Sequence, residues 1–358
     1  MAASFDANRM EISSPPVPVI EGVLHSFDKT YGWLNSAAAQ LCYSGSGHLA
    51  YAPGGVLPDP VRGLYWMDRS GKAEPVSVFG KRAFDTPKLA PDGRRIAYPG
   101  TFEDTQDLWI YDLFRETTIR LRSERTAMCG IWGPGGRGLA ISSWQGGVLD
   151  IWWRPLEDTQ AMEKLAESET DLFPSSFTPD GQILSIVKLG PPSIDILILR
   201  MQDKQLTPSM DTKYDELFPE FSPNGRWLAY VSNESGRFEV YLCSFPDVKE
   251  NIPVSNGGGC EPLWSPDGKE LFYLNLDRSK LMKVDIHTEP ELFIGRPQPL
   301  VDYPGVISSP FTGYNISPDG KRFLIQEPLE YKSVEVRQLQ LVLNWFEELK
   351  RLVPVGKN

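Results

Sequence analysis

Phe221-Ser222-Pro223-Asn224-Gly225-Arg226-Trp227-Leu228-Ala229-Tyr230 is the stretch that decides the fold, because versions of it recur along the chain. One short apolar run ends at Phe221, and a second begins at Trp227. Proline fixes φ at the first turn position, Asn or Asp suits the next, and Gly accepts the left-handed conformation that closes the turn. The stretch therefore predicts a β-hairpin.

Six further copies of this turn occur along the chain. They are Ala90-Pro91-Asp92-Gly93, Thr178-Pro179-Asp180-Gly181, Ser265-Pro266-Asp267-Gly268, Ser317-Pro318-Asp319-Gly320 and the degenerate Gly133-Pro134-Gly135-Gly136 and Ser44-Gly45-Ser46-Gly47. Successive closing glycines are 46, 43, 45, 44, 43 and 52 residues apart. A period of about 40–50 residues with four strands in each unit is typical of a β-propeller. We therefore predict an all-β, seven-bladed β-propeller, with a six-bladed ring and an irregular seventh hairpin as the alternative.

Further strands follow most of the hairpins. Third strands are expected at 108–113, 149–153, 194–199 and 238–242, and a more polar fourth strand at 118–121. Apolar runs of this length, separated by Gly, Pro, Asp and Asn, indicate strands rather than helices.

The two ends of the chain are expected to meet in one blade. Residues 1–19 resemble residues 282–300, which are the predicted third and fourth strands of the sixth repeat. The last hairpin, 314–326, is followed by one obvious strand, 334–342. We therefore expect a single propeller domain over 1–343 in which N-terminal strands within 1–24 complete the last blade, since such closure removes exposed sheet edges.

Residues 344–358 break the pattern and predict a short C-terminal helix and tail. Trp345, Leu349 and Leu352 share one face at helical spacing. Asn344 is placed to cap the helix, and Glu347 occupies the capping-box position.

Composition restricts the function classes. The chain has 358 residues, 41% of them hydrophobic, with 31 Gly and 31 Pro, as a turn-rich β protein requires. The formal net charge of −11 argues against binding nucleic acid or an anionic membrane surface. No apolar run is long enough to span a membrane, and residues 1–6 lack the start of a signal peptide. As written, the chain is expected in the cytoplasm, or outside it if it belongs to a longer receptor-type protein.

The recurring Ser-Pro-Asp-Gly hairpins resemble the TolB-like, WD-repeat-related propellers of bacteria. More narrowly, four segments resemble the propeller region behind acidobacterial-type receptor serine/threonine kinases: 16–23, 232–241, 268–274 and 342–345. The resemblance covers essentially the whole chain. It implies a sensing or interaction module, linked to a kinase in longer relatives.

Signatures of catalysis are missing from the sequence. There is no kinase Gly-rich loop, His-Arg-Asp or Asp-Phe-Gly, no P-loop, and no Gly-x-Ser-x-Gly nucleophile elbow. The three histidines show no metal-ligand spacing. We expect neither a metal nor a cofactor.

Carboxylates recur near the N-terminal ends of the innermost strands, which a propeller directs toward its central channel. Aligning the hairpins places Asp85, Phe173, Leu217, Cys260 and Thr312 at one channel-proximal register, with Glu216 one residue before it and Glu261 one residue after it. The residues expected to form an acidic channel mouth are Asp85, Asp171, Glu216 and Glu261. Such a mouth would take a cation or a basic peptide segment; the alternative is that these carboxylates cap turns.

The function expected from the sequence is a non-catalytic scaffold that binds a protein or peptide partner, plausibly as a signalling sensor. Rigid blades that hold variable loops around one opening suit recognition. The alternative is a propeller hydrolase that acts on a glycan or lactone through channel carboxylates, since paired carboxylates support acid–base chemistry.

Overall fold

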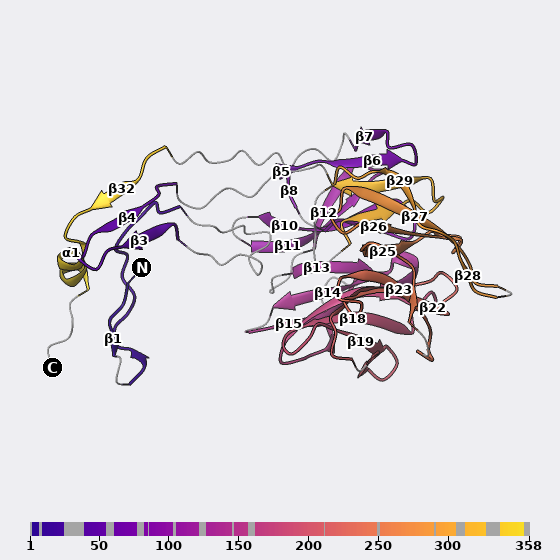
Figure 1. Cartoon of the computed structure of the whole chain (residues 1–358), viewed down its shortest axis with the longest axis horizontal. Helices are drawn as coiled ribbons and strands as arrows, with labels where there is room; N and C mark the ends of the chain where they lie inside the picture. The colour runs from indigo at the N-terminus through magenta and orange to yellow at the C-terminus, as the bar shows by residue number, and fades with distance from the viewer. Residues whose placement is uncertain are drawn as a thin grey trace. The chain divides into compact units, whose positions relative to one another are not determined.

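The chain folds into two compact units made almost entirely of strands, as the computed structural model shows (Figure 1). The described residues are 2–6, 9–24, 39–54, 61–76, 82–84, 86–102, 105–121, 127–144, 147–156, 162–210, 212–248, 251–289, 291–305, 312–326 and 337–353. The smaller unit combines Met1–Pro60 with Glu330–Asn358, and the larger is Val61–Leu329. This division differs from the predicted single domain over 1–343.

Six sheets of four or five strands make up most of the larger unit. The first holds β9 (Lys88–Leu89), β10 (Arg95–Phe102), β11 (Thr105–Asp112) and β12 (Thr117–Leu121). The second holds β13 (Ala127–Trp132), β14 (Gly138–Trp144), β15 (Leu149–Pro155) and β16 (Glu163–Ala166). The third holds β17 (Asp171–Phe177), β18 (Ile183–Leu189), β19 (Asp195–Arg200) and β20 (Gln205–Pro208).

The remaining sheets continue this plan. The fourth holds β21 (Glu216–Phe221), β22 (Trp227–Ser232), β23 (Glu239–Ser244) and β24 (Ile252–Pro253). The fifth holds β25 (Cys260–Trp264), β26 (Glu270–Leu274), β27 (Lys280–His287), β28 (Phe293–Ile294) and β29 (Gln298–Asp302). The sixth holds β30 (Tyr314–Ile316), β31 (Arg322–Gln326), β6 (Leu64–Asp68) and β7 (Ala73–Pro75), and β5 (Val61–Arg62) pairs separately with β8 (Arg82–Ala83).

The repeated turns join the first two strands of these sheets, as predicted. In the Ser222 turn, Gly225 has a φ of +70° and its N–H donates to the Ser222 carbonyl at 2.8 Å. The Ser222 hydroxyl lies 2.8 Å from Asn224 Oδ1. A positive φ is accessible to Gly without steric cost, which is why the repeat ends on this residue.

The sixth sheet corrects the predicted closure. Its third and fourth strands are β6 and β7, and Leu324 of β31 pairs with Trp66 of β6. Residues 1–24 instead contribute β1 (Phe5–Asp6) and β2 (Glu11–Ile12), which pair with each other. The strands that complete the last hairpin therefore lie within residues 64–75, not within 1–24.

The smaller unit holds the remaining hairpin. Strands β3 (Leu41–Tyr43) and β4 (Leu49–Tyr51) form a sheet with β32 (Gln340–Val342), followed by the helix α1 (Trp345–Leu352). The helix is confirmed, but its predicted cap is wrong. Asn344 has a φ of +53° and makes no side-chain capping bond, and Glu347 pairs with Lys350 at 2.9 Å.

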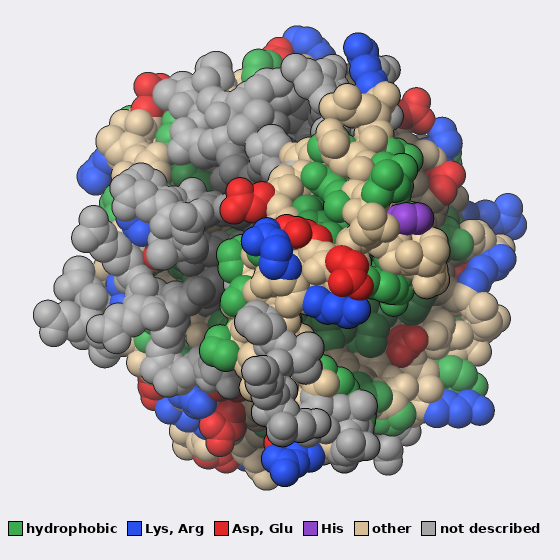
Figure 2. All heavy atoms as spheres, turned by 90° about the vertical axis from the view of Figure 1, so that its left-hand side faces the viewer, with side chains coloured by type: hydrophobic (Ala, Val, Ile, Leu, Met, Phe, Trp, Pro, Cys, Tyr) green, Lys and Arg blue, Asp and Glu red, His purple; other side chains and the backbone are tan. Residues whose placement is uncertain are grey.

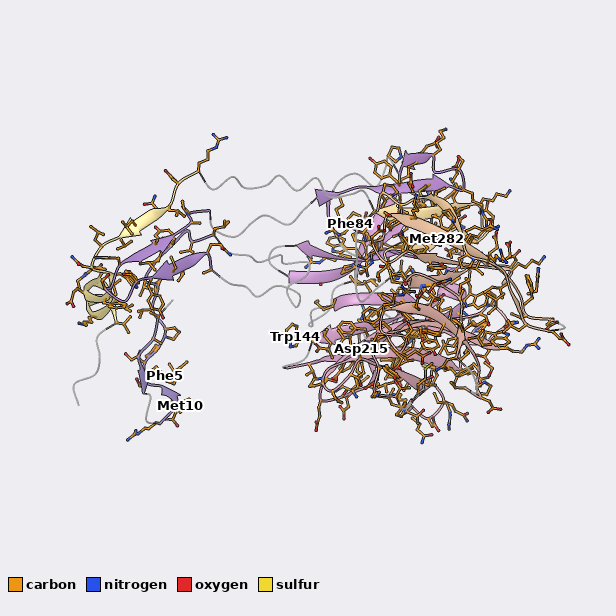
Figure 3. All side chains as sticks on the ribbon, viewed as in Figure 1. Phe5, Met10, Phe84, Trp144, Asp215 and Met282 are labelled. Carbon is orange, nitrogen blue, oxygen red and sulfur yellow. The ribbon has the colours of Figure 1, made fainter. Side chains whose placement is uncertain are left out.

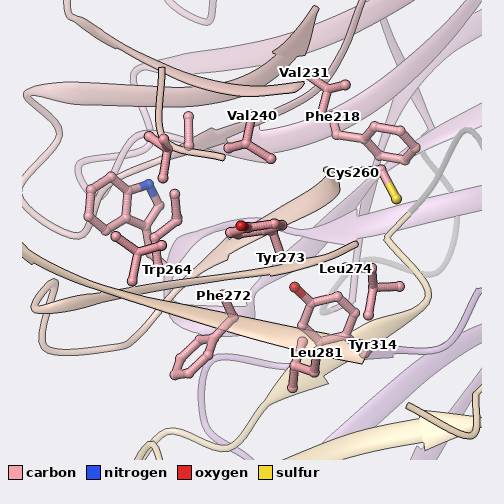
Figure 4. Packing of buried hydrophobic residues seen from close by; sticks show 14 of the residues in the cluster. Phe218, Val231, Val240, Cys260, Trp264, Phe272, Tyr273, Leu274, Leu281 and Tyr314 are labelled. Atoms are coloured by element: carbon pink, nitrogen blue, oxygen red, sulfur yellow. The ribbon is translucent and has the colours of Figure 1, made fainter. Parts of the chain in front are cut away.

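Apolar side chains pack between the sheets of the larger unit. The largest cluster includes Phe218, Val240, Trp264 and Phe272, all buried (Figure 4). Tyr314 of β30 joins this cluster of mainly fourth- and fifth-sheet residues. Among the described residues, none of the helices is long and apolar enough to cross a membrane.

Candidate functional site

Asp171, the first residue of β17, ties two sheets together. Its Oδ1 accepts a hydrogen bond from the backbone N–H of Leu149, at the start of β15, at 2.8 Å. The same arrangement recurs at the next sheet, where Asp215 Oδ1 accepts the N–H of Ile194 at 2.9 Å (Asp215 is labelled in Figure 3). Buried backbone donors need such partners. Asp171 therefore caps a backbone N–H, as expected from the alternative in which these carboxylates cap turns.

Glu216 lies buried at the start of β21, with 2% of its surface exposed. The Thr212 hydroxyl donates to its Oε1, while Oε2 has no hydrogen-bond partner among the described residues. Burial raises the pKa of this carboxyl to about 7, and the negative charges of Asp195 and Asp215 raise it further against the Thr212 bond. The Glu216 side chain is therefore enclosed by the protein.

Glu261 is fully buried in β25, and its contacts join the fifth and sixth sheets. Its Oε2 accepts the Gly313 N–H at 2.7 Å, and its carbonyl accepts the Tyr314 hydroxyl at 2.8 Å. Arg278 Nε lies 3.2 Å from Oε1, an ion pair without the alignment of a hydrogen bond. Burial raises the pKa of the Glu261 carboxyl, and the Arg278 charge opposes that rise. These contacts assign Glu261 to packing between sheets.

The predicted acidic mouth stays a prediction, because the contacts of its three described members do not include one another. Asp171, Glu216 and Glu261 each have a partner in a neighbouring segment, and none of them lines the cavity described next. Asp85 lies outside the described residues.

A cavity of about 520 Å³ lies instead near the C-terminal ends of the innermost strands. All six sheets contribute to its wall through one repeated position, which stands two residues before the first residue of each turn. The residues at this position are Lys88, Ile131, Ser176, Glu220, Leu263 and Asn315. Its volume falls within the range of small-ligand sites. We call this space the turn-end cavity.

Bulges interrupt four of the described innermost strands shortly before this position. The pairing with the second strand shifts between Leu217 and Glu220 in the fourth sheet, and between Cys260 and Leu263 in the fifth. Within these shifts, Phe218 has a φ of +52° and Glu261 a φ of +55°. A bulge adds a residue and redirects the side chains that follow. Leu217 and Cys260, which the sequence alignment placed at the channel-proximal register, stand before these shifts and are buried in the core.

The polar groups of the cavity wall differ in their partners. Ser176 Oγ accepts the Phe221 N–H at 2.9 Å, and Asn315 bridges the backbone of Pro87 and Leu89. Lys88 Nζ donates to the Thr312 carbonyl at 3.0 Å. The Glu220 carboxylate has no hydrogen bond or ion pair with any described residue, although Lys88 acts on it at longer range.

Glu220 is half-buried, and it keeps part of its surface accessible because it lines the cavity. Burial raises the pKa of its carboxyl to about 8, and the positive charge of Lys88 opposes that rise. A carboxyl group with a strongly perturbed pKa in a cavity indicates a functional site. From the sequence, Glu220 could have been found as the member of a position that recurs two residues before each turn. The bulge next to it could not have been predicted, because it depends on the pairing with the neighbouring strand.

Metal-ligand clusters and the distribution of surface charge are two further features that bear on the function of the described part of the chain. Within it, no group of three or more His, Cys, Asp or Glu side chains is placed to hold a metal ion. On the face shown in Figure 2, acidic side chains lie among basic ones. The described side chains on that face therefore carry both signs of charge (Figure 2).

The repeated four-stranded sheets around one cavity define a protein of the β-propeller class. The family model of the TolB beta propeller domain matches residues 111–299, more than half of the chain. The chain therefore belongs to the TolB β-propeller domain family.

Solved structures and curated relatives agree with this family. A TolB-type protein of Agrobacterium tumefaciens has a TM-score of 0.62 at 17% identity, covering 75% of this chain and 99% of that one. TolB of Acinetobacter baumannii has a TM-score of 0.52 at 16% identity, covering 70% of this chain and 66% of that one. At such identities the likeness concerns the fold alone.

Curated relatives match over shorter stretches. The Tol-Pal system protein TolB of Anaeromyxobacter dehalogenans is 24% identical over 112 residues, 31% of this chain and 26% of that protein. An uncharacterized protein of Agrobacterium fabrum is 24% identical over 157 residues, 40% of this chain and 53% of that protein. The matches thus span about half of one relative and a quarter of the other.

Proposed function

We propose that the protein is a non-catalytic β-propeller scaffold that binds a protein or peptide partner at the turn-end cavity. One observation carries this proposal, namely that all six innermost strands of the larger unit present one repeated position to a single cavity of about 520 Å³. Apolar groups from Ile131, Trp132 and Leu263 line it beside a few polar ones. Concave, mostly apolar walls with a few placed polar groups are typical of binding sites.

The scaffold in this proposal is a six-bladed ring, the alternative to seven blades. Contacts between successive innermost strands support it, as they link β9 to β13, β13 to β17, β17 to β21, β21 to β25 and β30 to β9. The bond from the Tyr314 hydroxyl to the Glu261 carbonyl supplies the remaining link, between β30 and β25. In this arrangement β6 and β7 complete the blade that closes the ring, and the β3–β4 hairpin belongs to the smaller unit.

The sensor role is part of the same proposal. A ring that recognises a peptide segment would suit a receptor-type kinase as its input module, and the recurring hairpins together with the TolB family match are compatible with such use. Reading the sequence encoded upstream of this chain, and assaying any kinase found there with and without the propeller's partner, tests this part.

A hydrolase acting on a glycan or lactone is the weaker candidate. Acid–base hydrolysis of a glycosidic bond ordinarily uses two carboxyl groups on either side of the bond. Of the described residues that line the turn-end cavity, Glu220 alone carries a carboxyl group. Glu216 and Glu261 are engaged outside the cavity.

Blocking the cavity tests the binding proposal. Ser175 lines the cavity and is half-buried, so Ser175→Trp would fill part of the space. Peptides from a displayed random library that the wild-type chain captures should be lost by this variant. Ser235→Trp is the matched control because Ser235 is exposed on a turn away from the cavity. Equal capture by both folded variants, checked by circular dichroism, would exclude the cavity as the binding site.

A further inference from the structure

We infer that the turn-end cavity receives a basic side chain, Lys or Arg, from an extended segment of the partner, with its charged group at the Glu220 carboxylate. This inference rests on the proposed binding function and adds the chemistry of the ligand. It also moves the expected recognition of a basic segment from the predicted mouth to the opposite ends of the innermost strands. The geometry of the wall carries the argument.

Glu220 is held in place while its carboxylate is left available. The Glu220 carbonyl accepts the indole N–H of Trp264 at 3.3 Å, and the bulge from Leu217 to Glu220 fixes the direction of its side chain. Both contacts use the backbone, so neither occupies the carboxylate. A carboxylate that is partly removed from water is favoured by a partner of opposite charge or by binding a proton. A cation from outside the chain meets that need.

The rest of the wall suits the hydrocarbon part of such a side chain. Ile131, Leu263 and Ile316 come from three different sheets and line the same cavity. Lys and Arg bury their methylene stems against apolar surface while their charged ends reach polar groups. A wall with apolar residues and one available carboxylate therefore fits a basic side chain better than a neutral or an acidic one.

Lys88 makes an acidic ligand the weaker choice. Its ammonium group already donates to the Thr312 carbonyl at 3.0 Å, whereas Glu220 has no such bond among the described residues. The net charge of −11 also favours the approach of a cation over that of an anion. Lys88 should nevertheless weaken the binding of a basic side chain by repulsion, which provides a second test.

Binding of a cation at Glu220 should strengthen as the pH rises. The pKa of its carboxyl is about 8 in the free protein, so a minor fraction is ionised at pH 7 and most is ionised at pH 9. Affinity for a Lys-containing peptide should therefore increase about tenfold between these values. The other groups that act on this carboxyl across the cavity are Lys88 and Tyr314, and the pKa of Tyr314 is raised well above 10 by burial, so it stays neutral.

The experiment starts from peptides selected at pH 9 on the wild-type chain and lost by Ser175→Trp. The inference predicts a Lys or Arg at one shared position. Calorimetry then compares the Lys peptide with its norleucine counterpart, which keeps the stem and lacks the charge. We expect norleucine to weaken binding at least tenfold, and Glu220→Gln to weaken the Lys peptide similarly and to remove its pH dependence.

Two variants complete the design. Glu169→Gln, at an exposed position outside the cavity, should bind like the wild type, and Lys88→Met should bind the Lys peptide more tightly. Cavity-dependent binding without a basic preference, or with Glu220→Gln unchanged, would overturn this inference and leave the scaffold standing. If the wild type captures no peptide, or only peptides that Ser175→Trp also captures, both proposals are overturned.

Discussion

Glu216 and Glu220 lie four residues apart, and burial raises the pKa of both carboxyl groups. The two side chains differ in what they contact. Glu216 is enclosed between segments and shares its surroundings with Asp195 and Asp215. Glu220 lines the turn-end cavity. Desolvation raises the pKa at both positions. Glu216 is enclosed by the protein, so the effect there is on stability, whereas Glu220 lines a cavity in which a ligand could contact it.

The carboxyl of Glu216 should make the folded chain less stable at higher pH. Its pKa in the folded chain, about 7, exceeds the ordinary value of 4.5, so the folded state binds the proton more tightly. The free energy of unfolding should fall as the pH rises through this window and stay low above it. Glu216→Gln should remove the part of this fall that Glu216 contributes, which is on the order of 3 kcal/mol between pH 4.5 and pH 8. Urea unfolding at both values, with the exposed Glu169→Gln as control, measures it; parallel curves for wild type and variant would contradict the assignment.

Asp171 should matter for stability rather than for ligand binding. Asp171→Ala leaves the Leu149 N–H without its acceptor and should cost about 1–3 kcal/mol. Glu169→Ala, two residues earlier and exposed, should cost much less. Denaturant unfolding compares the two variants, while peptide capture should be unchanged in both. A loss of capture in folded Asp171→Ala would support the predicted acidic mouth.

Turns and bulges set the character of each element. The Pro and Gly of each turn act through local backbone preference, which is why the hairpins follow from the sequence. A bulge such as that between Leu217 and Glu220 depends on how the first strand pairs with the second. That pairing redirects the residues that follow, so aligning the hairpin sequences alone did not single out the position of Glu220.

The turn glycines give a prediction at this scale. Gly225→Ala should destabilise the protein by about 1–2 kcal/mol, because a side chain at a φ of +70° meets its own backbone. A Cβ there would also come within 3.2 Å of Pro179 Cδ. Gly225→Asn should cost less than Gly225→Ala, since Asn tolerates the left-handed region better. Urea unfolding of the two variants measures the loss of stability in each. An equal loss in both would attribute the effect to the Pro179 contact rather than to the backbone conformation.

At the scale of the whole molecule, the sixth sheet unites segments about 250 residues apart. Strand β31 pairs with β6, and Arg62 Nη1 donates to Gln326 Oε1 at 2.9 Å in the interior. These contacts bring the beginning and the end of the larger unit together. An edge strand left without its neighbour exposes backbone groups that promote aggregation.

Truncation tests this closure. A fragment of residues 61–329 should unfold in one cooperative transition, because it holds every strand of the six sheets. A fragment of residues 82–329 lacks β5, β6 and β7, so it should melt at a lower temperature and aggregate through the uncovered β31. Scanning calorimetry and light scattering compare the two. Equal melting of both fragments would show that β6 and β7 contribute little to the closure.

The sequence by itself determined the hairpins, their period, the all-β TolB-like architecture and the C-terminal helix. These features depend on neighbours within a few residues, such as Pro223 before Gly225, or on the spacing of repeated motifs. Only the tertiary structure decided that β6 and β7, rather than residues 1–24, complete the last hairpin, and that Glu220 rather than Asp171, Glu216 or Glu261 lines the cavity. The reason is physical: strand partners and the burial of a carboxyl group depend on segments far away in the chain, and no local pattern encodes which of several similar strands will meet.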